Sequence, residues 1–157
     1  MSDQSYLAWP FLEDSHRSLA REVSDWAAAQ FDADGFHDHA DVDADCAAIR
    51  AALGEAGIVR NAVPAAFGGT HERLDVRSLC LIRENLAYRS GLADFVFAMQ
   101  GLGSGAISLF GSSDQQQAWL PGTGTGKLCA AFALTEPEAG SDVAAISTRA
   151  ELDGDHY

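Results

Sequence analysis

The residues best suited to chemistry lie at 132–142, where the sequence reads FALTEPEAGSD. A run typical of a β-strand, 128–134, ends at the segment 135–137 (TEP), which contains a proline. The small residues Ala139, Gly140 and Ser141 follow it. Backbone N–H groups and hydroxyls in a loop of this kind can hold a planar or phosphorylated cofactor. The segment therefore predicts a cofactor-binding loop at the end of a strand.

Three other groups of residues suggest a site, and each has a plainer interpretation. The run GTGTGK at 122–127 lacks the Walker spacing, because three residues rather than four separate its outer glycines and no Ser or Thr follows the lysine. His37 and His39 stand in an acidic stretch without the helical frame that fixes a metal site. Glu84 has no identifiable catalytic partner. We interpret these groups as a flexible link, a solvated loop and an exposed helical charge, and expect no metal.

Composition limits the partners and the compartment. The 157 residues include 10 basic and 23 acidic side chains, and the net charge of −13 would repel a nucleic acid backbone. Much of the acidity lies at 32–45, which is typical of a solvated loop. Cys46, Cys80 and Cys129 form no CxxC pair, so neither a disulfide framework nor a zinc site is indicated. No leader is visible at 1–10, so a reducing, cytoplasmic location without a membrane span is expected.

Hydrophobic spacing predicts that the first part of the chain is helical. Apolar residues recur every three or four positions over 15–31, 46–56 and 75–89, which predicts three amphipathic helices. The first two are expected to form an antiparallel pair. Gly57 stands just past the second helix as a C-terminal cap.

Two further helices are predicted before residue 122. The segment 92–109 is nearly all apolar, which predicts a buried central helix, too broken by glycines to cross a bilayer. Those glycines, which would allow another element or a ligand to approach closely, are Gly101, Gly103 and Gly105. A capping-box spacing at 113–116 predicts a short helix that ends at Pro121.

The chain after residue 127 has the pattern of strands and turns. The strand expected over 128–134 leads into the polar loop, and a second apolar stretch precedes Asp153, Gly154 and Asp155. That triplet is typical of a hairpin turn. The sequence thus indicates a helical region, a glycine-rich link and the beginning of a β region.

The polar loop and several other segments resemble the acyl-CoA dehydrogenase family of flavoproteins. The family pattern has a small residue, an aliphatic, Thr or Ser, Glu, two variable residues, a small residue, Gly, Ser or Thr, and Asp. The residues that match it without a gap are Ala133, Leu134, Thr135, Glu136, Ala139, Gly140, Ser141 and Asp142. Similar segments occur at 67–69 (FGG), at 111–121, and at 154–155 (GD).

The resemblance implies a mainly α fold: an N-terminal helical bundle of the acyl-CoA dehydrogenase type followed by the first strands of a β-sheet domain. On this basis we expect the helical domain over 1–121, a linker over 122–127, and an incomplete middle β domain over 128–157.

The resemblance also implies FAD as the cofactor. The isoalloxazine ring would contact the backbone around Phe132 and Leu134 and the hydroxyl and amide of Thr135. Gly140 and Ser141 would approach the pyrophosphate, and Ser141 would also bind the acyl-CoA thioester arm. Glu136 is not the catalytic base of the family, so a structural role is expected. Phe97 and Met99 are weaker candidates for the acyl-chain wall.

In the family, a carboxylate from a C-terminal region removes the α-proton of an acyl thioester while hydride passes from the β-carbon to the flavin. No such base can be located here, so we expect this segment alone to be inactive and to be completed by a C-terminal part or a partner chain. It would be a fragment, a split subunit or a non-catalytic remnant. An electron-transfer flavoprotein as acceptor and a homo-oligomer are also expected. The alternatives are a flavin oxidase or hydroxylase of the same fold, and a non-catalytic interaction module.

Overall fold

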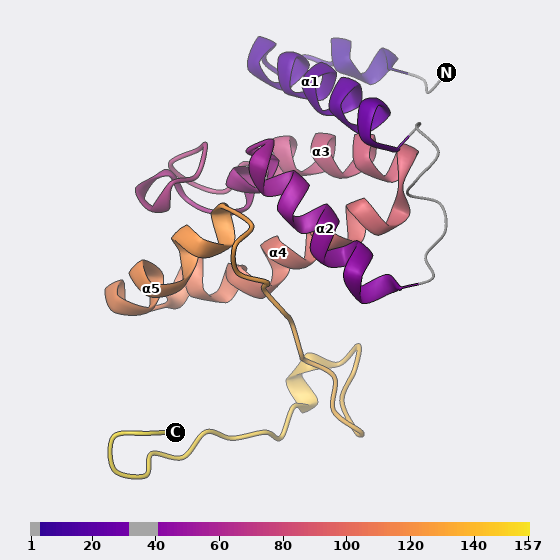
Figure 1. The fold of residues 1–157 in the computed structure, drawn as a ribbon. Helices are drawn as coiled ribbons and strands as arrows, with labels where there is room; N and C mark the ends of the chain where they lie inside the picture. The colour runs from indigo at the N-terminus through magenta and orange to yellow at the C-terminus, as the bar shows by residue number, and fades with distance from the viewer. Residues whose placement is uncertain (1–3, 32–40) are drawn as a thin grey trace.

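The computed structural model describes residues 4–31 and 41–157, and these residues are mainly helical, as predicted. The α-helices in this part are α1 (Asp14–Phe31), α2 (Val42–Glu55), α3 (Val76–Arg89), α4 (Gly91–Phe110) and α5 (Ser113–Gly124). Short 3-10 helices are η1 (Ser5–Ala8), η2 (Ile58–Ala62), η3 (Ala65–Phe67) and η4 (Val143–Ala145). The helices form one body, and the C-terminal segment extends away from it (Figure 1).

Helix α4 is the centre of this body because it packs against α2, α3 and α5. Its side chains Ala93, Val96 and Phe97 join residues of the other helices in the main hydrophobic core. From the sequence, the glycines of α4 are expected to rule out a membrane span. By length and composition alone, however, α4 could cross a membrane. In this structure α4 is instead the helix around which the others pack.

The predicted pairing of the first two helices is wrong. Helix α1 packs against α3, whereas α2 packs against α4. The apolar spacing itself is confirmed, since α1 buries Ala20, Val23, Ala27 and Phe31 on one face. Helix α4 is only partly buried, in contrast to the prediction. Its neighbours cover the face with Ala93, Val96 and Phe97, whereas other large apolar side chains stay exposed: Phe95, Leu102, Leu109 and Phe110.

Part of the acidic stretch starts a helix rather than forming a solvated loop. The Asp41 carboxylate accepts a hydrogen bond of 3.1 Å from the Ala44 amide and caps α2. Asp43 and Asp45 lie in the first turn, where negative charge is favoured by the helix dipole. The predicted cap at Gly57 is confirmed by its φ of 72°. The rest of the stretch, including His37 and His39, lies outside the described residues.

Helix α5 starts with a capping box one residue earlier than predicted. The Gln115 amide donates to Ser112 Oγ at 3.3 Å, and the Ser112 amide donates to Gln115 Oε1 at 2.9 Å. Both bonds satisfy amides that the helix itself leaves without a partner.

Pro121 does not end α5, which continues to Gly124. The proline removes one N–H from the helix, but the last turn has other support. Thr123 Oγ1 donates to the Trp119 carbonyl at 3.0 Å. Gly124 lies so close to Val63 that a Cβ there would be 2.6 Å from Val63 Cγ2. Tertiary packing therefore overrides the local signal of the proline.

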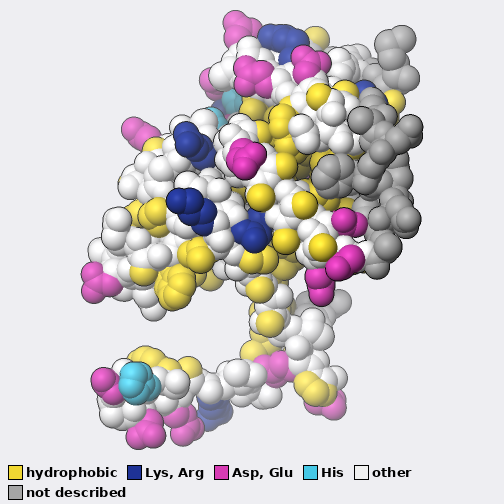
Figure 2. All heavy atoms as spheres, in the orientation of Figure 1, with side chains coloured by type: hydrophobic (Ala, Val, Ile, Leu, Met, Phe, Trp, Pro, Cys, Tyr) yellow, Lys and Arg dark blue, Asp and Glu magenta, His cyan; other side chains and the backbone are white. Residues whose placement is uncertain are grey.

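The chain after α5 has no β-strand within the described residues, and the start of a sheet domain stays a prediction. Strands are defined by pairing, and the only bridges after α5 close the tight turns Glu136 to Ala139 and Asp153 to His156. Gly154, with a φ of 67°, lies in the second turn, as the predicted turn signal required. Figure 2 shows this segment as an arm with acidic side chains grouped near its end.

Candidate functional site

The five predicted cofactor-binding residues lie on one open stretch of the C-terminal arm. Phe132 and Leu134 are 47% and 40% exposed, and Thr135, Gly140 and Ser141 are exposed as well. Among the described residues, none of the five has a hydrogen-bond partner. A Cβ placed on Gly140 would lie 4.0 Å from Thr135 Cγ2, so the loop returns to the end of the extended run. The geometry leaves their backbone and hydroxyl donors available to a ligand.

Glu136 closes the loop behind these donors. Its carboxylate accepts hydrogen bonds from the Ser147 amide at 2.8 Å, the Ser147 hydroxyl at 3.0 Å and the Thr148 amide at 2.9 Å. Hydrogen bonds from Thr148 and Ser147 lower the pKa of Glu136 to about 2. A carboxylate held in this way is a poor proton acceptor at neutral pH. Its contacts support the structural role inferred from the sequence.

The run before the motif is held against α4 by a buried side chain. Gln100, only 1% exposed, donates from Nε2 to the Leu128 carbonyl at 2.9 Å and accepts at Oε1 from the Ala130 amide at 2.7 Å. Its Nε2 also donates to the Thr123 carbonyl at 3.3 Å. The lack of a side chain at Gly103 makes room, since a Cβ there would lie 2.5 Å from the Ala131 nitrogen. Sequence reasoning predicted the close approach at the α4 glycines but missed Gln100.

The glycine run at 122–127 is packed rather than free. A Cβ on Gly122 would lie 2.6 Å from Leu128 Cδ1. Gly126, with a φ of 70°, would place a Cβ 2.7 Å from the Arg50 carbonyl, and its own carbonyl accepts from Arg50 Nη1. The interpretation of this run as a flexible link is therefore wrong, whereas its position as a domain boundary stays a prediction.

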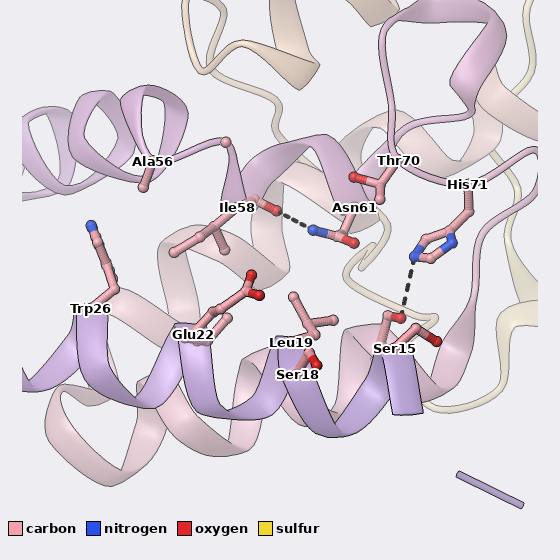
Figure 3. Close-up of a pocket in the computed structure, with 13 residues that line it drawn as sticks. Ser15, Ser18, Leu19, Glu22, Trp26, Ala56, Ile58, Asn61, Thr70 and His71 are labelled. Atoms are coloured by element: carbon pink, nitrogen blue, oxygen red, sulfur yellow. Dashed lines mark hydrogen bonds between the residues drawn. The ribbon is translucent and has the colours of Figure 1, made fainter. Parts of the chain in front are cut away.

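A cavity of about 620 Å³ lies between α1 and the segment containing η2, far along the chain from the motif (Figure 3). Leu19, Trp26 and Ile58 supply apolar walls, and Glu22 and Asn61 supply polar groups. Its lining includes no residue after Ser78, so this cavity is not formed by the predicted site.

Phe97 and Met99 line different cavities rather than one acyl pocket. Phe97 is 2% exposed and belongs to the main core, beside a cavity of about 390 Å³ next to α3. Met99 lines a cavity of about 410 Å³ together with Gln100 and Ala130. Only Met99 therefore lines the same cavity as residues of the run that leads to the motif.

A polar network joins α1 to α3. Glu13 N–H donates to His16 Nδ1 at 3.0 Å, which leaves His16 Nε2 as the donor to Asp75 Oδ2 at 2.7 Å. Ser78 Oγ also donates to Asp75 Oδ2 at 2.8 Å, and Arg77 Nε donates to Asp75 Oδ1 at 3.2 Å. Burial alone would raise the pKa of Asp75, but these bonds outweigh it and hold the pKa well below its usual range. We interpret the network as a clamp between two helices.

Glu84 is exposed on α3, as predicted, and forms a hydrogen bond with Tyr6 of η1. Burial and a hydrogen bond with Glu84 raise the pKa of Tyr6 to about 12. No group of His, Cys, Asp and Glu suited to a metal occurs among residues 4–31 and 41–157. The three cysteines, all within this part, are free thiols.

Comparison with known proteins identifies the family of the helical body. A family model described as "Acyl-CoA dehydrogenase, N-terminal domain" matches residues 13–127. The chain belongs to the acyl-CoA dehydrogenase family. The family resemblance seen in the sequence is thereby confirmed.

Two relatives and one solved structure illustrate the likeness to acyl-CoA dehydrogenases. The chain is 40% identical over 106 residues to a Bacillus subtilis protein named "Probable acyl-CoA dehydrogenase". The aligned region covers 66% of this chain and 18% of that protein. It is 28% identical over all 157 residues to acyl-CoA dehydrogenase FadE12 of Mycobacterium tuberculosis, 39% of which it spans. The crystal structure of a Bacillus anthracis acyl-CoA dehydrogenase complexed with FAD matches 87% of this chain and 23% of that chain, with 29% identity and a TM-score of 0.69. The chain therefore spans well under half the length of these acyl-CoA dehydrogenases.

Proposed function

We propose that this chain supplies the helical wall and one lip of the FAD site in an enzyme that dehydrogenates an acyl thioester between its α and β carbons. The observation that carries the proposal is the open stretch of donors from Phe132 to Ser141. It follows a run bound by Gln100 of the helical body, and Glu136 within it is bound to Ser147 and Thr148. FAD in the Bacillus anthracis neighbour supports the choice of cofactor.

The residues present fit a flavin. Thr135 has a hydroxyl and an amide without partners among the described residues, and Phe132 offers an exposed aromatic face beside them. Bound FAD would supply the electron acceptor for the reaction. Donors such as those of Thr135 stabilise the negative charge that builds on the ring during reduction. Gly140 and Ser141, which are small, would let the pyrophosphate approach the backbone, and Ser141 is the proposed contact of the thioester arm.

The proton-abstracting carboxylate is not assigned to this chain. Glu136 is occupied by Ser147 and Thr148, and the Asp142 carboxylate accepts from the Ala144 amide. We propose that a C-terminal part or a partner chain carries the base, within a cytoplasmic homo-oligomer that passes electrons to an electron-transfer flavoprotein.

A flavin titration tests the proposal. The chain, tagged and isolated from its native cells, is examined by native mass spectrometry for companion chains, and the isolated assembly is titrated with FAD. We expect the visible flavin absorption band, and its loss when an acyl-CoA is added without oxygen. Thr135→Val keeps the shape of the side chain and removes one hydrogen bond, so FAD should bind roughly tenfold more weakly.

Thr70→Val is the matched control, because Thr70 is exposed and its hydroxyl makes no hydrogen bond among the described residues. It should bind FAD like the unmodified chain. A colourless assembly that never takes up FAD would refute the proposal and favour the interaction module. A flavin that is bound but not bleached by acyl-CoA under these conditions would contradict the dehydrogenase and favour the hydroxylase alternative. Bleaching followed by rapid reoxidation on admission of oxygen would favour the oxidase.

A further inference from the structure

Gln100 binds one edge of the chain that leads to the motif. Its side-chain amide donates to the Leu128 carbonyl and accepts from the Ala130 amide, at 2.9 Å and 2.7 Å. In an extended chain the carbonyl of one residue and the amide two residues later point to the same side. A single residue of a neighbouring parallel strand makes the same two bonds. The Gln100 side chain therefore takes the place of a strand partner.

This pairing sets the rotation of the chain as well as its position. Because two groups on one edge are held by one planar amide, the segment cannot turn about its own axis without losing a bond. Phe132 and Leu134 follow Ala130 at intervals of two residues and so keep the same orientation relative to the pleat. Phe132 lies roughly 7 Å further along an extended chain.

The helix that carries Gln100 also provides the space for the chain. A Cβ on Gly103 would lie 2.7 Å from the Ala131 carbonyl oxygen and 2.8 Å from Ala130 Cβ. The main chain of 130–131 therefore lies directly on α4, three residues along from Gln100. The turn at Gly126 is held separately by Arg50, so the Gln100 bonds act on the extended part.

From this geometry we infer that Gln100 is a positioning residue for the flavin-facing segment 132–135. It acts through the backbone of Leu128 and Ala130 and does not itself reach the cofactor. This inference rests on the proposed FAD site. Glu136 joins the far end of the same segment to Ser147 and Thr148 of the arm, so the flavin-facing residues have hydrogen-bonded neighbours on both sides.

The test compares Gln100→Met with two controls in the 157-residue chain. Methionine keeps the length of the side chain and removes its bonds to 123, 128 and 130. Ser104→Ala removes another buried bond of α4, from Ser104 Oγ to the Gln100 carbonyl, without touching the segment. Gln117→Met makes the same chemical change at an exposed position. Amide hydrogen exchange is measured on the chain without FAD. FAD affinity and the visible circular dichroism of bound flavin are measured on the isolated assembly that contains each variant.

In Gln100→Met we expect the Ala130 amide to exchange roughly ten- to a hundredfold faster, because it loses its buried acceptor. The α1 amides should be unchanged, FAD should bind more weakly and the dichroism of the bound flavin should change. Neither control should alter these flavin properties.

Unchanged exchange at Ala130, or equal acceleration in α1 and at Ala130, would overturn the inference. So would unaltered FAD affinity and dichroism in Gln100→Met. If the unmodified assembly fails to bind FAD, the proposed function falls and this role falls with it, while the exchange data still decide whether Gln100 orders the segment.

Discussion

Substitution of Gly103 tests how closely the segment 130–131 lies on α4. A Cβ at this position would stand 2.5 Å from the Ala131 nitrogen, 2.7 Å from its oxygen and 2.8 Å from Ala130 Cβ. Backbone atoms cannot rotate out of the way, so Gly103→Ala must push the segment off the helix, at a cost of about 1–3 kcal/mol. Alanine regains about 1 kcal/mol of helix propensity over glycine. We therefore expect the free energy of unfolding to fall by up to about 2 kcal/mol.

The same helix contains its own controls. A Cβ at Gly105 meets nothing within 4 Å, and one at Gly101 meets only Ala62 Cβ at 3.9 Å, an ordinary contact. Gly105→Ala and Gly101→Ala should each raise the free energy of unfolding by about 1 kcal/mol through helix propensity. Urea unfolding followed by far-UV circular dichroism measures all three variants on one scale.

The order of the free energies of unfolding of the three variants shows whether the segment 130–131 lies on α4. If Gly103→Ala gains as much stability as Gly105→Ala, the segment does not lie on α4 and the reasoning about Gln100 loses its support. If Gly101→Ala and Gly105→Ala are destabilised as well, α4 is packed more tightly than the structure indicates. Hydrogen exchange at 128–131 should rise only in Gly103→Ala, because only there is the segment displaced.

Three further predictions concern single polar groups. Asp75→Asn should lower the free energy of unfolding at neutral pH by about 1–3 kcal/mol. Because the pKa of Asp75 is depressed in the folded state, its contribution to stability is full above about pH 4 and is lost as pH falls. The free energy of unfolding of the variant should therefore fall less steeply with acid than that of the unmodified chain. Parallel curves would contradict this. Ser112→Ala should cost about 1 kcal/mol in thermal unfolding through the lost cap, and an unchanged midpoint would show that the box is not formed. Glu136→Ala should speed amide exchange at Ser147 and Thr148 while the helical dichroism stays constant; protection that survives would show that Glu136 does not close the loop.

Much of the helical body could be predicted because its signals are local. The spacing of Val23, Ala27 and Phe31 predicts one helix, and the cap at Gly57 ends another. Pairing could not be predicted in the same way, since α1 and α2 have faces that fit several neighbours. The choice of α3 as the partner of α1 and of α4 as the partner of α2 is made by contacts between segments far apart in the chain.

Part of the candidate site could likewise be predicted from local sequence, and part could not. The motif at 132–142 could be predicted from residue types, because Thr135, Gly140 and Ser141 lie within seven residues of one another. Gln100 could not, although a lone amide among apolar residues and glycines in α4 was a weak signal. Its partners lie 23 to 30 residues away, and only the folded chain brings them together.

The sequence by itself determined the helical periods and the family, and it supplied the candidate cofactor motif, because each depends on residues close together in the chain. Tertiary structure decided three other points: which helices pair, that α5 continues past Pro121, and that the glycine run is packed against Val63, Leu128 and Arg50. The reason is that burial and close contact between distant segments outweigh local preferences of about 1–3 kcal/mol. The same distant contacts, through Gln100 and Gly103, hold the run that leads to the motif on the helical body.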